Sequence, residues 1–112
     1  MHLKPTLKSN MNHFFDPTNQ PNPNITMGLI TLQAGVKQPK QGYSYHKQDE
    51  FSYIISGSAH TILENGEDIL GRAGDAQLIE KNEGHINYND SNKPAVVVWF
   101  LVERKHSGKE SR

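Results

Sequence analysis

The sequence predicts an all-β protein made of short antiparallel strands. Short runs rich in apolar and β-branched residues alternate with turns that contain Gly, Asn, Asp or Pro, and no long window shows a helical period. Asn65-Gly66, which favours the tight type I′ turn of a hairpin, supports the same fold class. Strands at this spacing indicate a closed barrel or a double-sheet fold, although an immunoglobulin-like sandwich would have a similar number of strands.

The 112 residues are the size of one domain. We expect an N-terminal arm over residues 1–24, a single β domain over 25–103 and a charged, flexible tail over 104–112. Four prolines should prevent regular structure in the arm, but Phe14 and Phe15 predict that part of it docks on the domain.

Seven segments fit the strand pattern, namely 25–33, 51–56, 58–64, 67–70, 76–79, 85–89 and 95–102. The last of these is apolar at every position, so both of its faces should be covered. Either the N-terminal arm or a partner subunit can provide that cover, and we therefore expect a homodimer.

Composition excludes several classes of function. The chain has 12 basic and 12 acidic residues. A protein with this charge balance has no broad positive potential that would attract nucleic acid or anionic lipid. It has no cysteine, which excludes disulfides and cysteine-ligated zinc and fits a reducing compartment. No apolar run is long enough to cross a bilayer, and the first residues do not resemble a signal peptide. We expect a soluble cytoplasmic protein.

Three potential metal ligands are His46, Glu50 and His85. In a regular strand Ser44 and His46 face the same way, and Glu50 can join them after a short turn. His85 would come from a sequence-distant strand. Two imidazoles and one carboxylate are typical of open non-haem iron sites, and manganese, nickel or zinc would also accept them.

These residues lie in two motifs that resemble those of the cupins, G-x5-H-x-H-x(3,4)-E-x6-G and G-x5-P-x-G-x2-H-x3-N. The matching positions are His46, Glu50 and Gly57 in the first motif and Gly74, His85 and Asn89 in the second. The resemblance implies a double-stranded β-helix (jelly-roll) barrel of about eight or more strands, with a metal at its open end. It also implies enzymes such as oxygenases, decarboxylases, lyases, isomerases and epimerases.

Four positions depart from the motifs. Ser44 replaces the first histidine, and the glycine before it is displaced to Gly42. Glu80 replaces the proline, and Asn82 replaces the second glycine. Loss of one histidine should weaken metal binding and leave a position open for water or substrate.

Other polar residues near the motifs are expected to line the pocket. Ser52 and Asn87 share the inward faces of Glu50 and His85, and Gln48 is a possible substitute ligand. For His60 we favour packing or pocket lining over ligation. Bystander roles are expected for His2, His13 and His106, and a core position for Trp99.

The leading hypothesis is a metal-dependent enzyme that acts on a small polar metabolite. The alternative is a non-catalytic cupin that binds a small molecule without a tightly held metal, and the missing histidine favours this alternative. A third hypothesis is a structural dimer subunit of a larger assembly.

Overall fold

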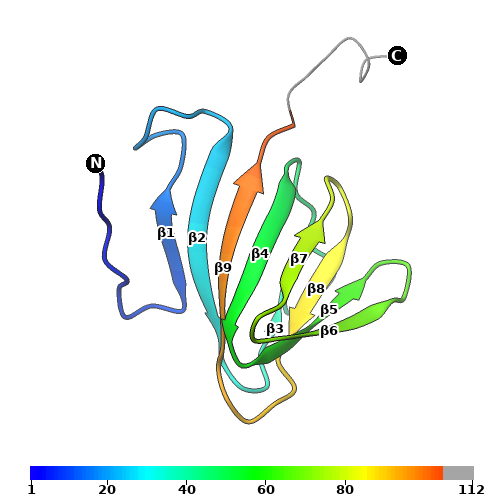
Figure 1. Ribbon diagram of the computed structural model, residues 1–112. Coiled ribbons are helices and arrows are strands. Elements are labelled where there is room, and N and C mark those ends of the chain that lie inside the picture. Colours follow the sequence, from blue (N-terminus) through cyan, green and yellow to red (C-terminus); the bar gives the residue numbers. More distant parts are fainter. Residues whose placement is uncertain (105–112) are drawn as a thin grey trace, which may run out of the picture.

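The computed structural model describes residues 1–104, and these form two antiparallel sheets without a helix. The five-stranded sheet has the order β1-β2-β9-β4-β7 and the four-stranded sheet the order β3-β8-β5-β6 (Figure 1). The strands are β1 Met11–Phe15, β2 Ile25–Leu32, β3 Lys37–Gln38, β4 Asp49–Ser56, β5 Ser58–Leu63, β6 Asp68–Arg72, β7 Ala76–Ile79, β8 His85–Tyr88 and β9 Ala95–Val102. This arrangement confirms the predicted jelly-roll fold. The described residues include no helix long and apolar enough to span a membrane.

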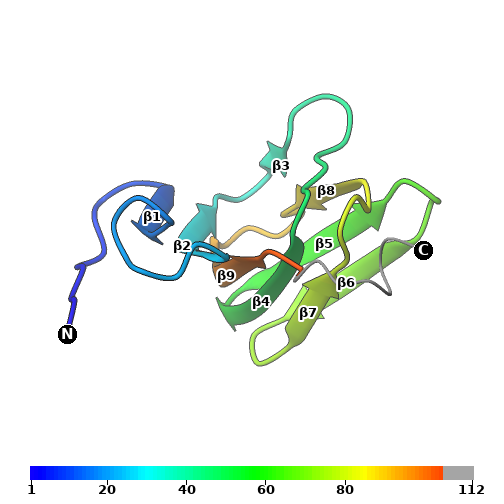
Figure 2. The same ribbon diagram turned by 90° about the horizontal axis from the view of Figure 1, so that it is seen from above.

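The core lies between the two sheets, which face one another when seen from above (Figure 2). Leu32 from β2, Ala59 from β5 and Ala95 from β9 form a cluster of buried side chains. Trp99 is also buried, and its indole lies over Gly28, where no side chain would fit. Alternation along these strands thus places one face of β2, β5 and β9 in the core.

The β5–β6 hairpin forms around Asn65-Gly66 as predicted, but its turn is not type I′. Gly66 has a φ of 95°, whereas Asn65 is not among the residues with positive φ. The side chain of Asn65 instead accepts a hydrogen bond from the backbone N–H of Glu67. The N–H of Gly66 donates to the carbonyl of Leu63 and the N–H of Leu63 to the carbonyl of Glu67, so the loop has three residues with a left-handed glycine at its end.

The N-terminal arm contains a strand, which corrects the expectation that its prolines exclude regular structure. β1 pairs with β2 with Met11 opposite Ile30, in a stretch that contains no proline. It extends the sheet sideways and does not lie over β9, which is flanked by β2 and β4. The arm therefore docks mainly on β2 and reaches β9 through the contact of His13 with Trp99.

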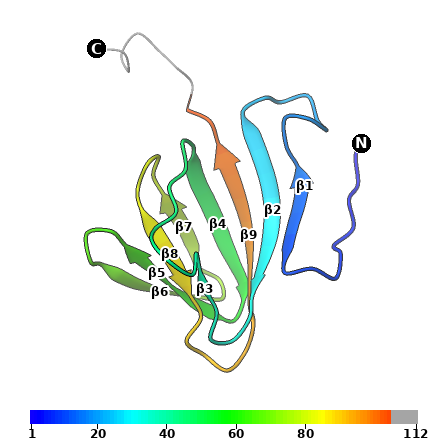
Figure 3. The same cartoon turned by 180° about the vertical axis from the view of Figure 1, so that it is seen from behind.

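Two further segments differ from the sequence expectations. β3 is only two residues long and pairs with β8 (Figure 3), and such a short strand leaves no recognisable pattern in the sequence. Arg104, at the start of the predicted tail, donates hydrogen bonds to the carboxylate of Asp49. The rest of that tail, 105–112, lies outside the described residues.

Candidate metal centre

Both sheets contribute to a cluster of two histidines and one carboxylate. Glu50, in β4, lies opposite Leu101 on β9 and points into the space between the sheets. His46 precedes β4, and His85 begins β8 on the other sheet. The Nε2 atoms of His46 and His85 lie 3.0 and 4.0 Å from Oε1 of Glu50, and one donor atom from each residue lies within 4.8 Å of the others.

His85 is held in the tautomer that a metal ligand needs. Its side chain is only 2% exposed, and its Nδ1 lies 3.0 Å from the carbonyl oxygen of Glu83. Because a carbonyl only accepts hydrogen bonds, Nδ1 carries the proton. In the neutral ring the lone pair of Nε2 lies on the side of Glu50, which is the arrangement found when a second bond orients a ligating imidazole.

His46 is anchored through its backbone as well as its side chain. Its carbonyl accepts a hydrogen bond of 2.7 Å from the N–H of Asn82, which has a left-handed φ of 64°. The hydrogen bond from the ring to Glu50 raises the pKa of His46, although partial burial opposes this change. A cation bound between the two side chains would take the place of this proton.

Ser44 faces the same cavity as the three potential ligands. Its N–H donates to the carbonyl of His85 at 2.9 Å and its carbonyl accepts from the N–H of His85 at 3.1 Å, an isolated antiparallel bridge. Residues paired in this way project their side chains from the same face. The same-face placement of Ser44 and His46 therefore comes from this bridge and a loop, and not from the regular strand that the sequence suggested.

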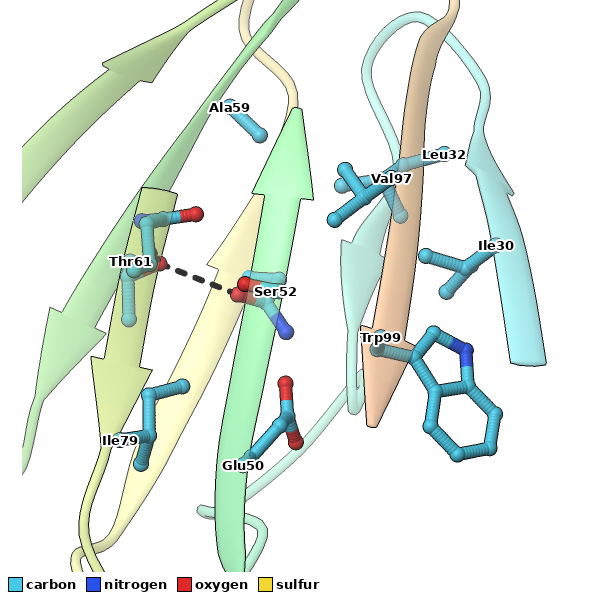
Figure 4. Close-up of a pocket in the computed structure, with 11 residues that line it drawn as sticks. Ile30, Leu32, Glu50, Ser52, Ala59, Thr61, Ile79, Val97 and Trp99 are labelled. Atoms are coloured by element: carbon cyan, nitrogen blue, oxygen red, sulfur yellow. Dashed lines mark hydrogen bonds between the residues drawn. The ribbon is translucent and has the colours of Figure 1, made fainter. Parts of the chain in front are cut away.

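The cluster opens into a cavity of about 210 Å³. A smaller cavity of about 40 Å³ adjoins it and shares Glu50, Asn87, Ile30 and Trp99 with it. Figure 4 shows Glu50 beside this smaller cavity, between Ile79 on one side and Trp99 on the other. Apolar side chains thus flank the carboxylate of Glu50 on both sides.

The predicted lining residues have different positions in the structure. Ser52 lines the smaller cavity, and Asn87 lines both. Within the part of the chain that the structure describes, Gln48 and His60 line neither of these two cavities. His60 alternates with the buried Ala59 and Thr61 on β5, so it faces outward.

His60 belongs to a separate ion-pair cluster on the outer surface. Its Nδ1 lies 2.7 Å from Asp68 and its Nε2 lies 2.9 Å from Asp90. The two carboxylates lie on opposite sides of the ring. The two aspartates and His60 therefore cannot all coordinate the same metal ion.

Among the residues of the larger cavity that sequence reasoning missed, those from β1 and β3 stand out. Met11 and His13 come from β1, and Gln38 comes from β3. Neither strand was predicted, and these three residues lie outside the two motifs that contain His46 and His85. The long-range pairing of β1 with β2 is what brings them to the site.

The donor set fits a divalent metal ion. Nitrogen and oxygen ligands bind at about 2.1 Å, so two ligand atoms on one ion lie at most about 4.2 Å apart. The distances of 3.0 and 4.0 Å to Glu50 fall within this limit, and the donor atoms of the two imidazoles lie within 4.8 Å of each other. One carboxylate and two neutral imidazoles suit iron, manganese, nickel or zinc.

Comparison with known proteins agrees with the motifs. A family model described as a cupin domain matches residues 28–101, whereas a search of curated protein sequences found no significant match. A predicted oxalate decarboxylase from Thermotoga maritima is 20% identical with a TM-score of 0.71, and the match covers 84% of this chain and 79% of that one.

Two other structural neighbours are the Clostridium difficile EutQ protein and the polyketide cyclase RemF from Streptomyces resistomycificus. Their identities are 15% and 13% and their TM-scores 0.67 and 0.70, with 83% and 87% of this chain covered. This chain spans 66% of the length of each of them. At these identities the neighbours show the fold alone, but the family model matches more than half of the sequence, and the chain therefore belongs to the cupin family.

Proposed function

We propose that this cupin binds one divalent metal ion through His46, Glu50 and His85 and acts on a small polar metabolite in the adjoining cavity. The observation that carries the proposal is the convergence of three donor atoms within 4.8 Å at a cavity of about 210 Å³. Iron, manganese, nickel and zinc all fit the donor set. A cavity of this size admits a small metabolite.

The reaction types that suit such a site are those of oxygenases, lyases or decarboxylases, and isomerases. When bound, the ion would supply Lewis acidity or redox chemistry. The amides of Gln38 and Asn87 line the cavity and can orient the polar groups of a ligand. Ile30 and Leu101 give the cavity an apolar side that helps to exclude water.

The structural neighbours support a small-molecule ligand. One is a predicted oxalate decarboxylase and another a polyketide cyclase, and both names describe chemistry on small molecules. The fold does not select among these reactions.

A non-catalytic cupin that binds a small molecule is the second candidate. Ser44 favours it, because this residue faces the site where the cupin motif has its first histidine. A serine hydroxyl is a weaker ligand than an imidazole, so the ion would be held less tightly. Turnover of a ligand by the metal-loaded protein would contradict this candidate.

We further propose that the protein is a homodimer. The outer face of β4 and β7 exposes Phe51, Tyr53, Ile55 and Leu78, each between 45% and 52% exposed. Phe51 lies opposite Leu78, so these side chains form one continuous surface. A second copy is the occupant that this face suits, because nothing among the described residues covers it.

Elemental analysis of protein purified without chelators tests the metal site. We expect close to one divalent ion per chain in the wild type and a large loss in His46→Ala and His85→Ala. His60→Gln is the matched control, since it removes a histidine outside the cavity and should retain the ion. Wild-type metal content in both alanine variants would contradict the assignment.

A further inference from the structure

We propose that His13, from β1, contacts the ligand bound at the metal centre, and that this ligand is a small monoanion. The inference rests on the proposed function, because the metal is what holds the ligand. It adds a substrate-contacting residue from the N-terminal arm and names the class of ligand.

The pairing of β1 with β2 places His13 at the cavity. His13 lies opposite Gly28, and both His13 and Met11 line the same cavity as the three potential metal ligands. His13 is not part of the group whose donor atoms lie within 4.8 Å of one another. Its imidazole therefore belongs to the wall that a ligand on the metal would meet, and not to the ligand set.

The ring of His13 packs against Trp99. The two rings meet edge to face, with centroids 5.4 Å apart and an interplanar angle of 77°. His13 nevertheless remains an exposed residue, and it lines the cavity. An oriented and accessible imidazole can donate a hydrogen bond to an oxyanion without the cost of ordering a mobile side chain.

The charges that line the cavity indicate a ligand with one negative charge. Glu50 is the only carboxylate among the described lining residues, and no lysine or arginine is among them. A divalent ion together with one carboxylate leaves a net charge of about +1, which one oxyanion neutralises. A second negative charge on the ligand would have no cation to pair with.

The test separates a contact with the ligand from simple packing on Trp99. His13→Phe keeps an aromatic ring beside Trp99 but cannot form a hydrogen bond, whereas His13→Gln keeps a side chain that can. Co²⁺ is loaded into the wild type, the two His13 variants and His2→Ala. The last of these is the control, because it removes another histidine of the N-terminal arm. Azide, a linear monoanion that binds open cobalt sites, is then titrated while the visible cobalt bands are recorded.

We expect His13→Phe to bind azide about tenfold more weakly, which corresponds to loss of one hydrogen bond to a charged group. His13→Gln should recover most of the affinity, and His2→Ala should match the wild type. Equal azide affinity in His13→Phe and the wild type, with Co²⁺ bound in both, overturns the role of His13 and leaves the metal site intact. A wild type that binds no metal overturns the proposed function, and this inference with it.

A second titration tests the charge of the ligand. 3-Hydroxypropionate and malonate share a three-carbon skeleton, but malonate carries a second carboxylate. Malonate chelates divalent ions in solution more strongly than 3-hydroxypropionate does, so the affinity of each acid for the Co²⁺-loaded protein is divided by its affinity for free Co²⁺. We expect this ratio to be higher for 3-hydroxypropionate. A higher ratio for malonate, or no binding of either acid, would overturn the assignment to a monoanion.

Discussion

Asn89, the last residue of the second cupin motif, has a structural role in this protein. Its side chain is fully buried, and its Nδ2 donates to the carbonyl oxygens of Leu32 and Lys93 at 2.8 and 2.7 Å. Its Oδ1 accepts hydrogen bonds from the backbone N–H and the hydroxyl of Ser91. One amide thus ties the turn before β9 to the end of β2.

Replacing this amide should destabilise the fold without disturbing the metal. In Asn89→Ala the carbonyls of Leu32 and Lys93 lose the hydrogen bonds from this amide, although that of Lys93 still accepts one from the hydroxyl of Ser91, and we expect the free energy of unfolding in urea to fall by about 2–3 kcal/mol. The metal content of the folded variant should equal that of the wild type. A loss of stability below about 0.5 kcal/mol would show that water replaces these bonds.

Asn82 shows why a departure from the motif was hard to interpret from the sequence. It stands where the motif has a glycine, and in the structure it has a φ of 64°. Asparagine tolerates this left-handed conformation better than other residues with a side chain, so the turn that anchors His46 is preserved. The sequence shows the substitution but not the backbone conformation.

At the scale of the elements, the bridge between Ser44 and the start of β8 offers a way to restore the missing ligand. We expect Ser44→His to tighten metal binding by about tenfold, equivalent to ~1.4 kcal/mol, because an imidazole would then project from the same face as His85. Isothermal titration with Zn²⁺ measures the change, with Ser44→Ala as control. Equal or weaker affinity in Ser44→His would mean that position 44 does not reach the ion.

The β5–β6 hairpin is tied to the turn after β8 through His60. Hydrogen bonds to Asp68 and then Asp90 raise the pKa of His60 above its ordinary value of about 6.5. A raised pKa in the folded state means that the charged ring contributes its full stability below about pH 6.5, and that this contribution is lost as the pH rises through the raised pKa.

The pH dependence of stability tests this link. We expect the urea midpoint of the wild type to be higher than that of His60→Gln. The difference should be largest at about pH 6 and smallest at about pH 9. His2→Ala, in the exposed start of the arm, should show no such trend. A difference that is constant over this range, or that grows with pH, would show that the pairs do not depend on an imidazolium.

The sequence predicted the longer strands because their side chains alternate or are apolar throughout. It missed β1 and β3, since the first is stabilised by distant pairing with β2 and the second is two residues long. Without β1, the sequence predicts only a bystander role for His13. By contrast, the motif spacing alone identified His46, Glu50 and His85, which the fold brings together.

At the scale of the whole molecule, the exposed face of β4 and β7 predicts self-association. Light scattering at micromolar concentration should give the mass of a dimer, and Phe51→Glu should shift it towards the monomer because a charge cannot be buried cheaply in an apolar interface. Ile69→Glu, at an exposed position on β6, is the control and should remain dimeric. A monomeric wild type would contradict the proposed interface.

The central claim concerns the position of one ion, and anomalous diffraction tests it most directly. Crystals grown with Mn²⁺ or Zn²⁺ and measured at the absorption edge of the metal would show where the ion lies. We predict one strong peak at about 2.0–2.3 Å from Nε2 of His46, an oxygen of Glu50 and Nε2 of His85. No peak between these residues, with the metal elsewhere or absent, would contradict the account.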